Sequence, residues 1–87
     1  MMIIHNLKIK PEYFRNIVAG VKNFEIRNND RDFHVGDILV LEEYDTNYTG
    51  NFLHAEVIYI LDDKQYLKDG YVALSIKNRL DLGAKLM

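Results

Sequence analysis

Two stretches of aliphatic residues restrict this chain to a fold built around buried β-strands. Residues 38–41, Ile-Leu-Val-Leu, are apolar at every position, which is typical of a strand that is covered on both faces. Residues 52–61 carry the longest predicted strand, with an apolar residue at each odd position. In a chain of 87 residues, strands of this length bury a core only by curling into a small barrel or a tightly folded sheet.

Three further stretches alternate between apolar and polar residues as strands do. In residues 3–10 the alternation places His5 on the apolar side with Leu7 and Ile9, and in residues 71–77 it points Val72, Leu74 and Ile76 inward. Residues 23–27 alternate as well. We expect Phe24 and Ile26 on the core face of that strand, with Glu25 and Arg27 on the opposite face.

One short helix is predicted between the first and second strands. Pro11 suits the first helical position, and the helix should end near Ala19, just before Gly20, which can adopt the left-handed conformation that ends a helix. Four residues at helical spacing form one apolar stripe that needs a sheet to pack against: Phe14, Ile17, Val18 and Val21. We expect this helix to cover the outside of the strand at residues 38–41.

The sequence therefore predicts a mainly β (α+β) fold, a small five- to six-stranded β-barrel with one short helix after the first strand. We expect a single domain over residues 1–87, with a core at about 3–77 and a tail at 78–87. Residues 45–51 and 62–70 are predicted as loops, the second with one helical turn near 65–68.

Composition and charge exclude several classes of function. The chain has no cysteine, no run of eighteen apolar residues and no secretion signal, so we expect a cytoplasmic protein without disulfides or a membrane span. Its net charge of −2 is segregated, with six basic and three acidic residues through Arg31 but eight acidic and no basic residues from 32 to 63. A protein that grips long duplex DNA is usually strongly basic, so a small basic patch that contacts one nucleotide or a few phosphates is the better expectation.

The most chemically suggestive stretch is residues 20–32, which joins the helix to the second strand. Glu25 and Arg27 lie two apart, about 6 to 7 Å, on one strand face, so they can pair with each other or hold one ligand together. An exposed ion pair of that kind is the ordinary structural reading and contributes only about 0 to 1 kcal/mol. Lys22 lies close by in sequence, and its direction is open because the bend at Gly20 interrupts the strand alternation.

Catalysis and metal binding have little support in the residue inventory. Only three residues carry an aliphatic hydroxyl, and none stands beside a histidine: Thr46, Thr49 and Ser75. His54 and Glu56 share a strand face, but two candidate ligands without a third favour a cross-strand polar pair over a metal site. We predict no metal and no cofactor. If the protein is an enzyme, Glu25 is the candidate base and Lys22 its assistant.

The stretch Gly20-x-Lys22-x-x-Glu25-x-Arg27, followed by the turn Val35-Gly36-Asp37, resembles the G-x-K-x-x-E-x-R signature of ASCH domains. These are small β-barrels of the PUA-like superfamily. Other segments are similar to an uncharacterised bacterial and phage branch of that group, and with them the resemblance spans about residues 4–77: His5-x-Leu7-Lys8, residues 11–14 and residues 29–33.

This resemblance implies a cleft that binds RNA or a nucleotide-like ligand. Some ASCH relatives hydrolyse an acylated cytidine with a lysine, a threonine three residues later and a downstream glutamate. The residue three after Lys22 is Glu25, so the presumed nucleophile is missing and that activity is not carried over.

Three hypotheses follow for the function. The first is a module that binds RNA or a nucleotide-like small molecule, with six candidate ligand-binding residues: Lys22, Glu25, Arg27, Arg31, His5 and Tyr13. Of these, His5 also has the ordinary reading of a core or rim histidine. The second hypothesis is a small hydrolase acting on a nucleoside derivative or RNA. The third is a partner-binding domain that uses the acidic segment at residues 32–63. We favour the first.

Overall fold

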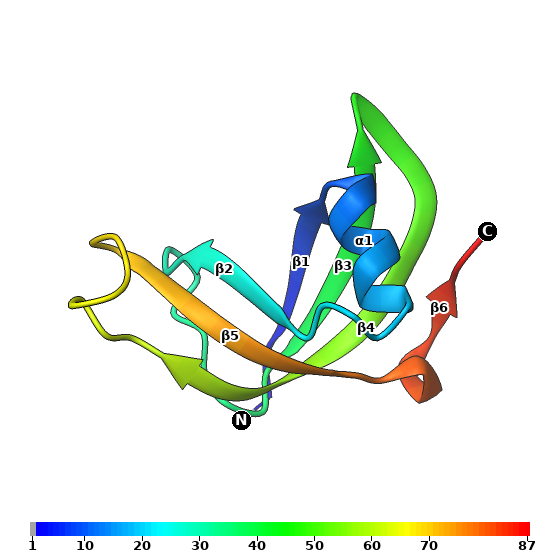
Figure 1. Cartoon of the computed structure of the whole chain (residues 1–87). Helices are drawn as coiled ribbons and strands as arrows, with labels where there is room; N and C mark the ends of the chain where they lie inside the picture. Colours follow the sequence, from blue (N-terminus) through cyan, green and yellow to red (C-terminus); the bar gives the residue numbers. More distant parts are fainter. Residues whose placement is uncertain (1) are drawn as a thin grey trace.

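The computed structural model describes residues 2–87 and contains one curled sheet of six strands with a single α-helix (Figure 1). The strands are β1 (Ile4–Ile9), β2 (Phe24–Asn28), β3 (Ile38–Asp45), β4 (Asn47–Leu61), β5 (Tyr71–Asn78) and β6 (Ala84–Lys85). Helix α1 (Pro11–Val18) follows β1, and the 3-10 turn η1 (Leu80–Leu82) precedes β6. The prediction of a mainly β fold with one short helix after the first strand is confirmed.

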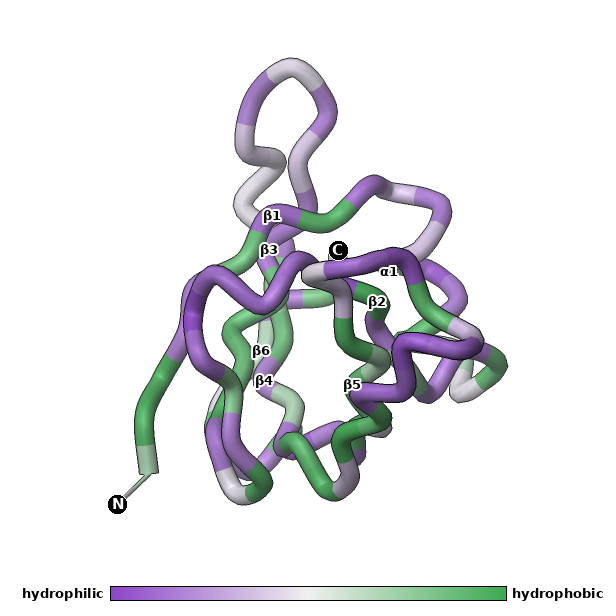
Figure 2. Tube along the Cα trace, turned by 90° about the vertical axis from the view of Figure 1, so that its left-hand side faces the viewer, coloured by the Kyte–Doolittle hydropathy of each residue, from purple (hydrophilic) through white to green (hydrophobic). Residues whose placement is uncertain are grey.

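The strand order makes the sheet a half-barrel. Neighbouring strands follow the order β1-β3-β4-β5-β2, and β6 adds to β4. The pair β1–β3 is parallel, and the other pairs are antiparallel. The backbone of the sheet curls around an interior (Figure 2), and the buried side chains of the core fill that interior. Among residues 2–87 no backbone ladder joins the edge strands β1 and β2, and we call the gap between them the seam.

The core lies on the concave face of the half-barrel. Alternate residues of each long strand point into it, as the sequence predicts for β1 and β5. The buried cluster contains Leu7, Ile9, Phe14, Ile17, Phe33, Leu39, Leu41, Leu53, Ala55, Val57, Val72, Leu74 and Ile76. Because Phe14 and Ile17 belong to this cluster, α1 covers the concave face. The expectation that the helix covers the outside is wrong, and Val40, on the outer face of β3, is only half-buried.

Helix α1 ends close to where the sequence places its end. Its last residue is Val18, and Gly20 has a φ of 76°, the left-handed conformation expected of it. The backbone N–H groups of Val21 and Lys22 both donate to the carbonyl of Asn16. The apolar stripe is only half used, because Val18 and Val21 are exposed.

The orientation of β2 is opposite to the prediction. Phe24 and Ile26 are exposed, whereas Glu25 is buried. The reason is the pairing with β5, in which Glu25 lies opposite Leu74. Directly opposed residues of two strands share a face of the sheet, so the inward direction of Leu74 sets that of Glu25. The outer face instead carries Phe24 and Ile26 beside the exposed Tyr59 and Leu61, across β5.

The predicted loop at residues 45–51 is wrong, because most of it belongs to β4. Strands β3 and β4 form a long hairpin that turns at Thr46, whose φ is 59°, and the tip of the hairpin projects beyond the rest of the chain (Figures 1 and 2). A register shift between Val57 and Tyr59 also breaks the predicted apolar face of β4. Tyr59 is therefore exposed, and Ile60 packs against the core.

The segment predicted as a tail, residues 78–87, packs against the sheet. After η1, β6 pairs with β4 through Lys85 and Ala84. The side chain of Asn51 also makes two bonds to the backbone of Met87: its Nδ2 donates to the Met87 carbonyl, and its Oδ1 accepts from the Met87 N–H. The segment at residues 62–70 forms turns, and one of them, closed by the backbone N–H of Leu67 on the carbonyl of Asp63 at 2.9 Å, is a single helical turn close to the predicted one. Within residues 2–87, no helix has the length and apolar character needed to cross a membrane.

Candidate functional site

The main candidate site is a half-open cavity of about 500 Å³ beside the seam. It lies where the end of β1, the start of α1 and the strand β2 meet. Its walls are formed by Lys8, Ile9, Lys10, Tyr13, Lys22, Phe24, Glu25, Ile26 and Arg27. These residues come from two short segments, 8–13 and 22–27, which the fold brings together across the seam.

Glu25 is the buried polar centre of this cavity, with a side chain that is only 5% exposed. Its Oε2 atom pairs with Lys22 Nζ, and its Oε1 atom accepts from Arg27 Nε at 2.9 Å and contacts Arg27 Nη2 at 2.7 Å. Lys22 also donates to the carbonyl of Phe24. Both carboxylate oxygens are therefore engaged by cations, which is what permits a charge at this depth.

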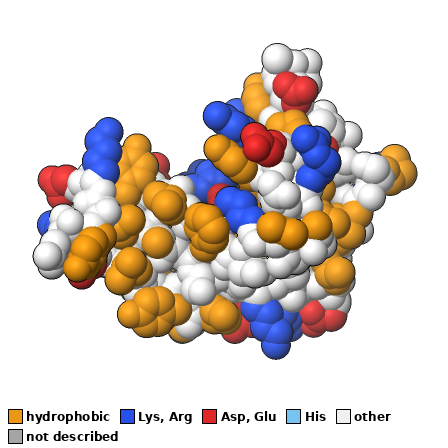
Figure 3. Space-filling model, viewed as in Figure 1, with side chains coloured by type: hydrophobic (Ala, Val, Ile, Leu, Met, Phe, Trp, Pro, Cys, Tyr) orange, Lys and Arg blue, Asp and Glu red, His pale blue; other side chains and the backbone are white. Residues whose placement is uncertain are grey.

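The cavity wall is cationic and aromatic around that centre. Four basic side chains and one carboxylate give it a formal charge of +3, although the whole chain has a net charge of −2. The Lys22 ammonium lies 5.3 Å from the ring centroid of Tyr13 and 4.8 Å from that of Phe24. Figure 3 shows basic side chains gathered near the middle of this face, with acidic atoms among them. Such a wall favours an anion that also carries a flat ring.

Two arginines cross the seam and bond to the free edge of β1. Arg27 Nη2 donates to the carbonyl of Lys8 at 2.7 Å, and Arg31 Nη1 donates to the carbonyl of Asn6 at 3.0 Å. Carbonyls two residues apart on a strand point to the same side, so the two guanidinium groups bond to successive carbonyls along the same edge of β1. Arg27 therefore has a structural role as well as a place in the cavity wall.

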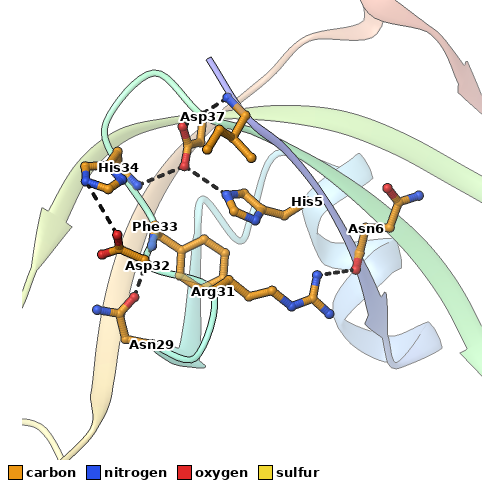
Figure 4. Close-up of polar contacts among 9 residues, drawn as sticks. His5, Asn6, Asn29, Arg31, Asp32, Phe33, His34 and Asp37 are labelled. Carbon is orange, nitrogen blue, oxygen red and sulfur yellow. Dashed lines mark hydrogen bonds and ion pairs between the residues drawn. The ribbon is translucent and has the colours of Figure 1, made fainter. Parts of the chain in front are cut away.

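His5 belongs to a separate buried cluster at the other end of β1 (Figure 4). Its Nε2 atom lies 2.8 Å from Asp37 Oδ2, and its ring packs edge-on against Phe33 at 4.8 Å between centroids. Asp37 also accepts from the backbone N–H groups of His34, at 2.9 Å, and Ile3, at 3.3 Å. Burial raises the pKa of Asp37, but these hydrogen bonds lower it more, and the net pKa lies below its usual value.

A second hollow of about 380 Å³ lies between α1 and the C-terminal segment. Its polar centre is Glu43, which is buried near the turn of the hairpin and accepts from Thr49 Oγ1 at 2.7 Å and from Asn51 Nδ2 at 3.0 Å. These bonds connect β3, β4 and, through Asn51, the C-terminal residue Met87. We interpret Glu43 as a structural link between these segments.

The remaining candidate ligands of a metal are used elsewhere. The imidazole Nδ1 of His54 lies 2.7 Å from the carbonyl of Gly83, and Glu56 pairs with Arg79 at 2.7 Å. His54 and Glu56 thus bond to partners on other segments, and the Glu56–Arg79 pair links β4 to the residue after β5, in keeping with the expected cross-strand polar pair. Among residues 2–87 no three His, Cys, Asp or Glu side chains gather as a metal site would require.

The structure brings together four of the six predicted ligand-binding residues. Lys22, Glu25, Arg27 and Tyr13 line the cavity, whereas Arg31 bonds to the edge of β1 and His5 lies in the Asp37 cluster. Sequence reasoning did not select Lys8 and Lys10, which also line the cavity. The excess of basic residues up to Arg31 pointed to this part of the chain. That Lys8 and Lys10 lie beside β2, however, follows only from the curl of the sheet.

Comparison with known proteins places the chain in a family. Residues 4–76 match the model described as "Domain of unknown function (DUF3850)". The chain is 35% identical over 75 residues to an uncharacterised 12.9 kDa protein in the GpA 3′ region of Escherichia phage P2, covering 85% of this chain and 68% of that protein. Its fold is similar to the crystal structure of hypothetical protein PH0355, with a TM-score of 0.58 and 20% identity over 91% of this chain and 100% of that one. The chain therefore belongs to the DUF3850 family.

Proposed function

We propose that this member of the DUF3850 family binds RNA or a nucleotide-like molecule in the cavity beside the seam. The observation that carries the proposal is the set of four basic side chains around one buried, doubly paired carboxylate. Lys8 and Lys10 lie on the exposed rim of the cavity. Their ammonium groups are the ones we expect to meet a phosphate first, since Lys22 and Arg27 are engaged by Glu25.

The size and the aromatic wall of the cavity favour a nucleotide over a simple anion. Small-molecule sites commonly measure about 300 to 1,000 Å³, and this cavity of about 500 Å³ falls within that range. Tyr13 is 42% exposed and Phe24 is 48% exposed. Each offers a ring face on which a base can stack, as in proteins that bind unpaired nucleotides.

The resemblance of residues 20–27 to the ASCH signature supports the same proposal. The three charged residues of that signature meet in one place, because Lys22 and Arg27 both contact Glu25. We propose that the chain is an ASCH-type, PUA-like domain on this basis. A cytoplasmic location, where RNA and free nucleotides are abundant, is part of the proposal.

Hydrolysis of a nucleoside derivative or RNA is the alternative. It requires Glu25 to accept a proton as a general base, yet both of its oxygens are paired with cations. With Lys22 on one oxygen and Arg27 on the other, neither carboxylate oxygen is free to reach a proton on a bound ligand. We therefore assign Glu25 the role of fixing Lys22 and Arg27 in the cavity wall, and we favour binding over catalysis.

The test is a calorimetric titration with adenosine and adenosine 5′-monophosphate (AMP) at low and high salt. We expect AMP to bind more tightly than adenosine, and we expect the difference to shrink as salt rises, because phosphate contacts release counterions. Lys10→Ala should weaken AMP binding by about five- to tenfold, equivalent to about 1 kcal/mol for one lost charge contact. Lys10 is exposed, and its ammonium lies 5.9 Å from the ring centroid of Tyr13, so the fold should be little affected.

Lys64→Ala is the matched control, since Lys64 lies in the loop after β4 with a side chain that is 76% exposed. It removes the same charge from the protein without touching the cavity. Equal weakening by Lys10→Ala and Lys64→Ala would show that only net charge matters and would refute the site. Release of product from an acylated nucleoside or from RNA during the same incubation would favour the hydrolase alternative.

A further inference from the structure

The β3–β4 hairpin carries a pair of tyrosines next to the cavity. Tyr44 and Tyr48 are directly opposed across the hairpin, with ring centroids 5.1 Å apart and an interplanar angle of 80°. Tyr48 is 56% exposed. A cross-strand aromatic pair stabilises a hairpin, but that alone does not require a ring so open to solvent.

Lys8 connects this pair to the cavity. Its ammonium lies 4.4 Å from the ring centroid of Tyr44 and 5.6 Å from that of Tyr48, and the same residue lines the cavity wall. Lys8 points away from the core on β1, as Tyr44 does on β3. The cation and the two rings therefore form one continuous surface that begins at the cavity rim and ends on the hairpin.

The charges around the hairpin limit what this surface can accept. Glu42, which is bonded by Asn6, and Asp45 flank the tyrosines, and both disfavour a phosphate at the hairpin itself. The basic groups lie on the cavity side. The arrangement therefore suits a ligand whose phosphates remain at the lysines while an uncharged, flat group reaches the tyrosines.

We propose that the Tyr44–Tyr48 pair is a second binding position, which stacks the base next in the strand to the nucleotide held in the cavity. The inference rests on the proposed function and narrows it to a short single-stranded oligonucleotide. Aromatic side chains on which successive bases stack, beside cations that follow the backbone, are the usual means of holding single strands. Lys8 is shared by the two positions and contacts the linking phosphate.

The test compares AMP with the 5′-phosphorylated diadenosine ribonucleotide pApA in calorimetric titrations. We expect the intact protein to bind pApA about tenfold more tightly than AMP, as one stacked base provides. Tyr48→Ala should remove that advantage and leave the affinity for AMP unchanged. Tyr48→Phe, which keeps the ring, should retain it. Tyr66→Ala is the control, because Tyr66 is 75% exposed in the loop after β4 and should alter neither affinity.

The outcomes separate this inference from the proposal on which it rests. Binding of AMP without any gain for pApA overturns the second position and leaves the cavity proposal standing. Equal loss of both ligands in Tyr48→Ala, with Tyr48→Phe no better, overturns the inference as well, because Tyr48 would then act only by supporting the fold. Failure of the intact protein to bind either probe overturns both. Circular dichroism of each variant establishes that it is folded.

Discussion

Replacement of Asp37 by alanine should be among the most destabilising single changes in this chain. The Asp37 carboxylate is 1% exposed and accepts hydrogen bonds from His5 Nε2 and from the backbone N–H groups of His34 and Ile3. Alanine leaves the buried His5 donor unpaired, at a cost of about 1 to 3 kcal/mol, and removes two further bonds of about 1 kcal/mol each. The free energy of unfolding should fall by about 4 kcal/mol, a large part of the 5 to 15 kcal/mol that is usual for a domain.

Asparagine at the same position should cost less. Its amide oxygen can take the place of Asp37 Oδ2 and keep the bonds to His5 and His34, which measure 2.8 and 2.9 Å. The longer bond from Ile3, at 3.3 Å, is then lost together with the charge. We expect Asp37→Asn to lower the free energy of unfolding by about 1 to 2 kcal/mol.

The pH dependence gives the Asp37 prediction a second readout. Because the pKa of folded Asp37 lies below its ordinary value of 3.8, its charge stabilises the fold above that value. The contribution is lost as the pH falls through the folded-state pKa. The difference in stability between the native protein and Asp37→Asn should therefore be constant from pH 7 to about pH 5 and should narrow below about pH 4.

Urea denaturation followed by circular dichroism measures these free energies. Asp30→Ala is the matched control, since Asp30 lies exposed in the same connection between β2 and β3. The reasoning fails if Asp37→Ala costs less than about 1 kcal/mol or no more than Asp30→Ala. It also fails if the gap between the native protein and Asp37→Asn widens in acid.

Two further predictions concern the backbone and the seam. Arg27→Ala should lower the free energy of unfolding by about 2 to 3 kcal/mol, because it removes one partner of the buried Glu25 and leaves the carbonyl of Lys8 without its donor. In a thermal melt, Arg27→Lys should recover part of the lost stability. An Arg27→Ala variant as stable as the native protein would show that the bonds of Arg27 across the seam do not stabilise the fold. Thr46→Gly should raise the free energy of unfolding by about 0.5 to 1 kcal/mol, because Thr46 has a φ of 59° that glycine adopts without steric strain. Thr49→Gly, in strand β4, should lower the stability. A lower free energy of unfolding in both variants would contradict the turn geometry at Thr46.

The sequence predicted best the strands that bury one clear face. The alternation of β1 and the inward residues Val72, Leu74 and Ile76 of β5 agree with the structure, because a large hydrophobic free energy sets their direction. β2 was predicted the wrong way round for the same reason. Hydrophobicity alone sends Phe24 and Ile26 inward, but the register with β5 and the paired charges around Glu25 reverse the choice.

The features that were missed depend on contacts between distant segments. The hairpin at residues 45–51 is polar and contains Gly50, so its local composition indicates a loop, although pairing with β3 makes it a strand. The break in the alternation of β4 between Val57 and Tyr59 arises from the register with β5. Lys22, Glu25 and Arg27 were found because they are close in sequence, whereas Lys8 and Lys10 reach the same cavity only after the sheet has curled.

The parallel pairing of β1 with β3 also sets the order in which this chain can fold during synthesis. Ile4 pairs with Ile38, 34 residues later, and β2 pairs with β5 only once residues 71–78 have been made. The β3–β4 hairpin closes over a few residues and can form as soon as it leaves the ribosome, since short loops close fastest. The first strand therefore stays unpaired until β3 has been made, and a nascent chain halted before residue 71 has β2, with its Glu25 and Arg27, still without a place in the sheet.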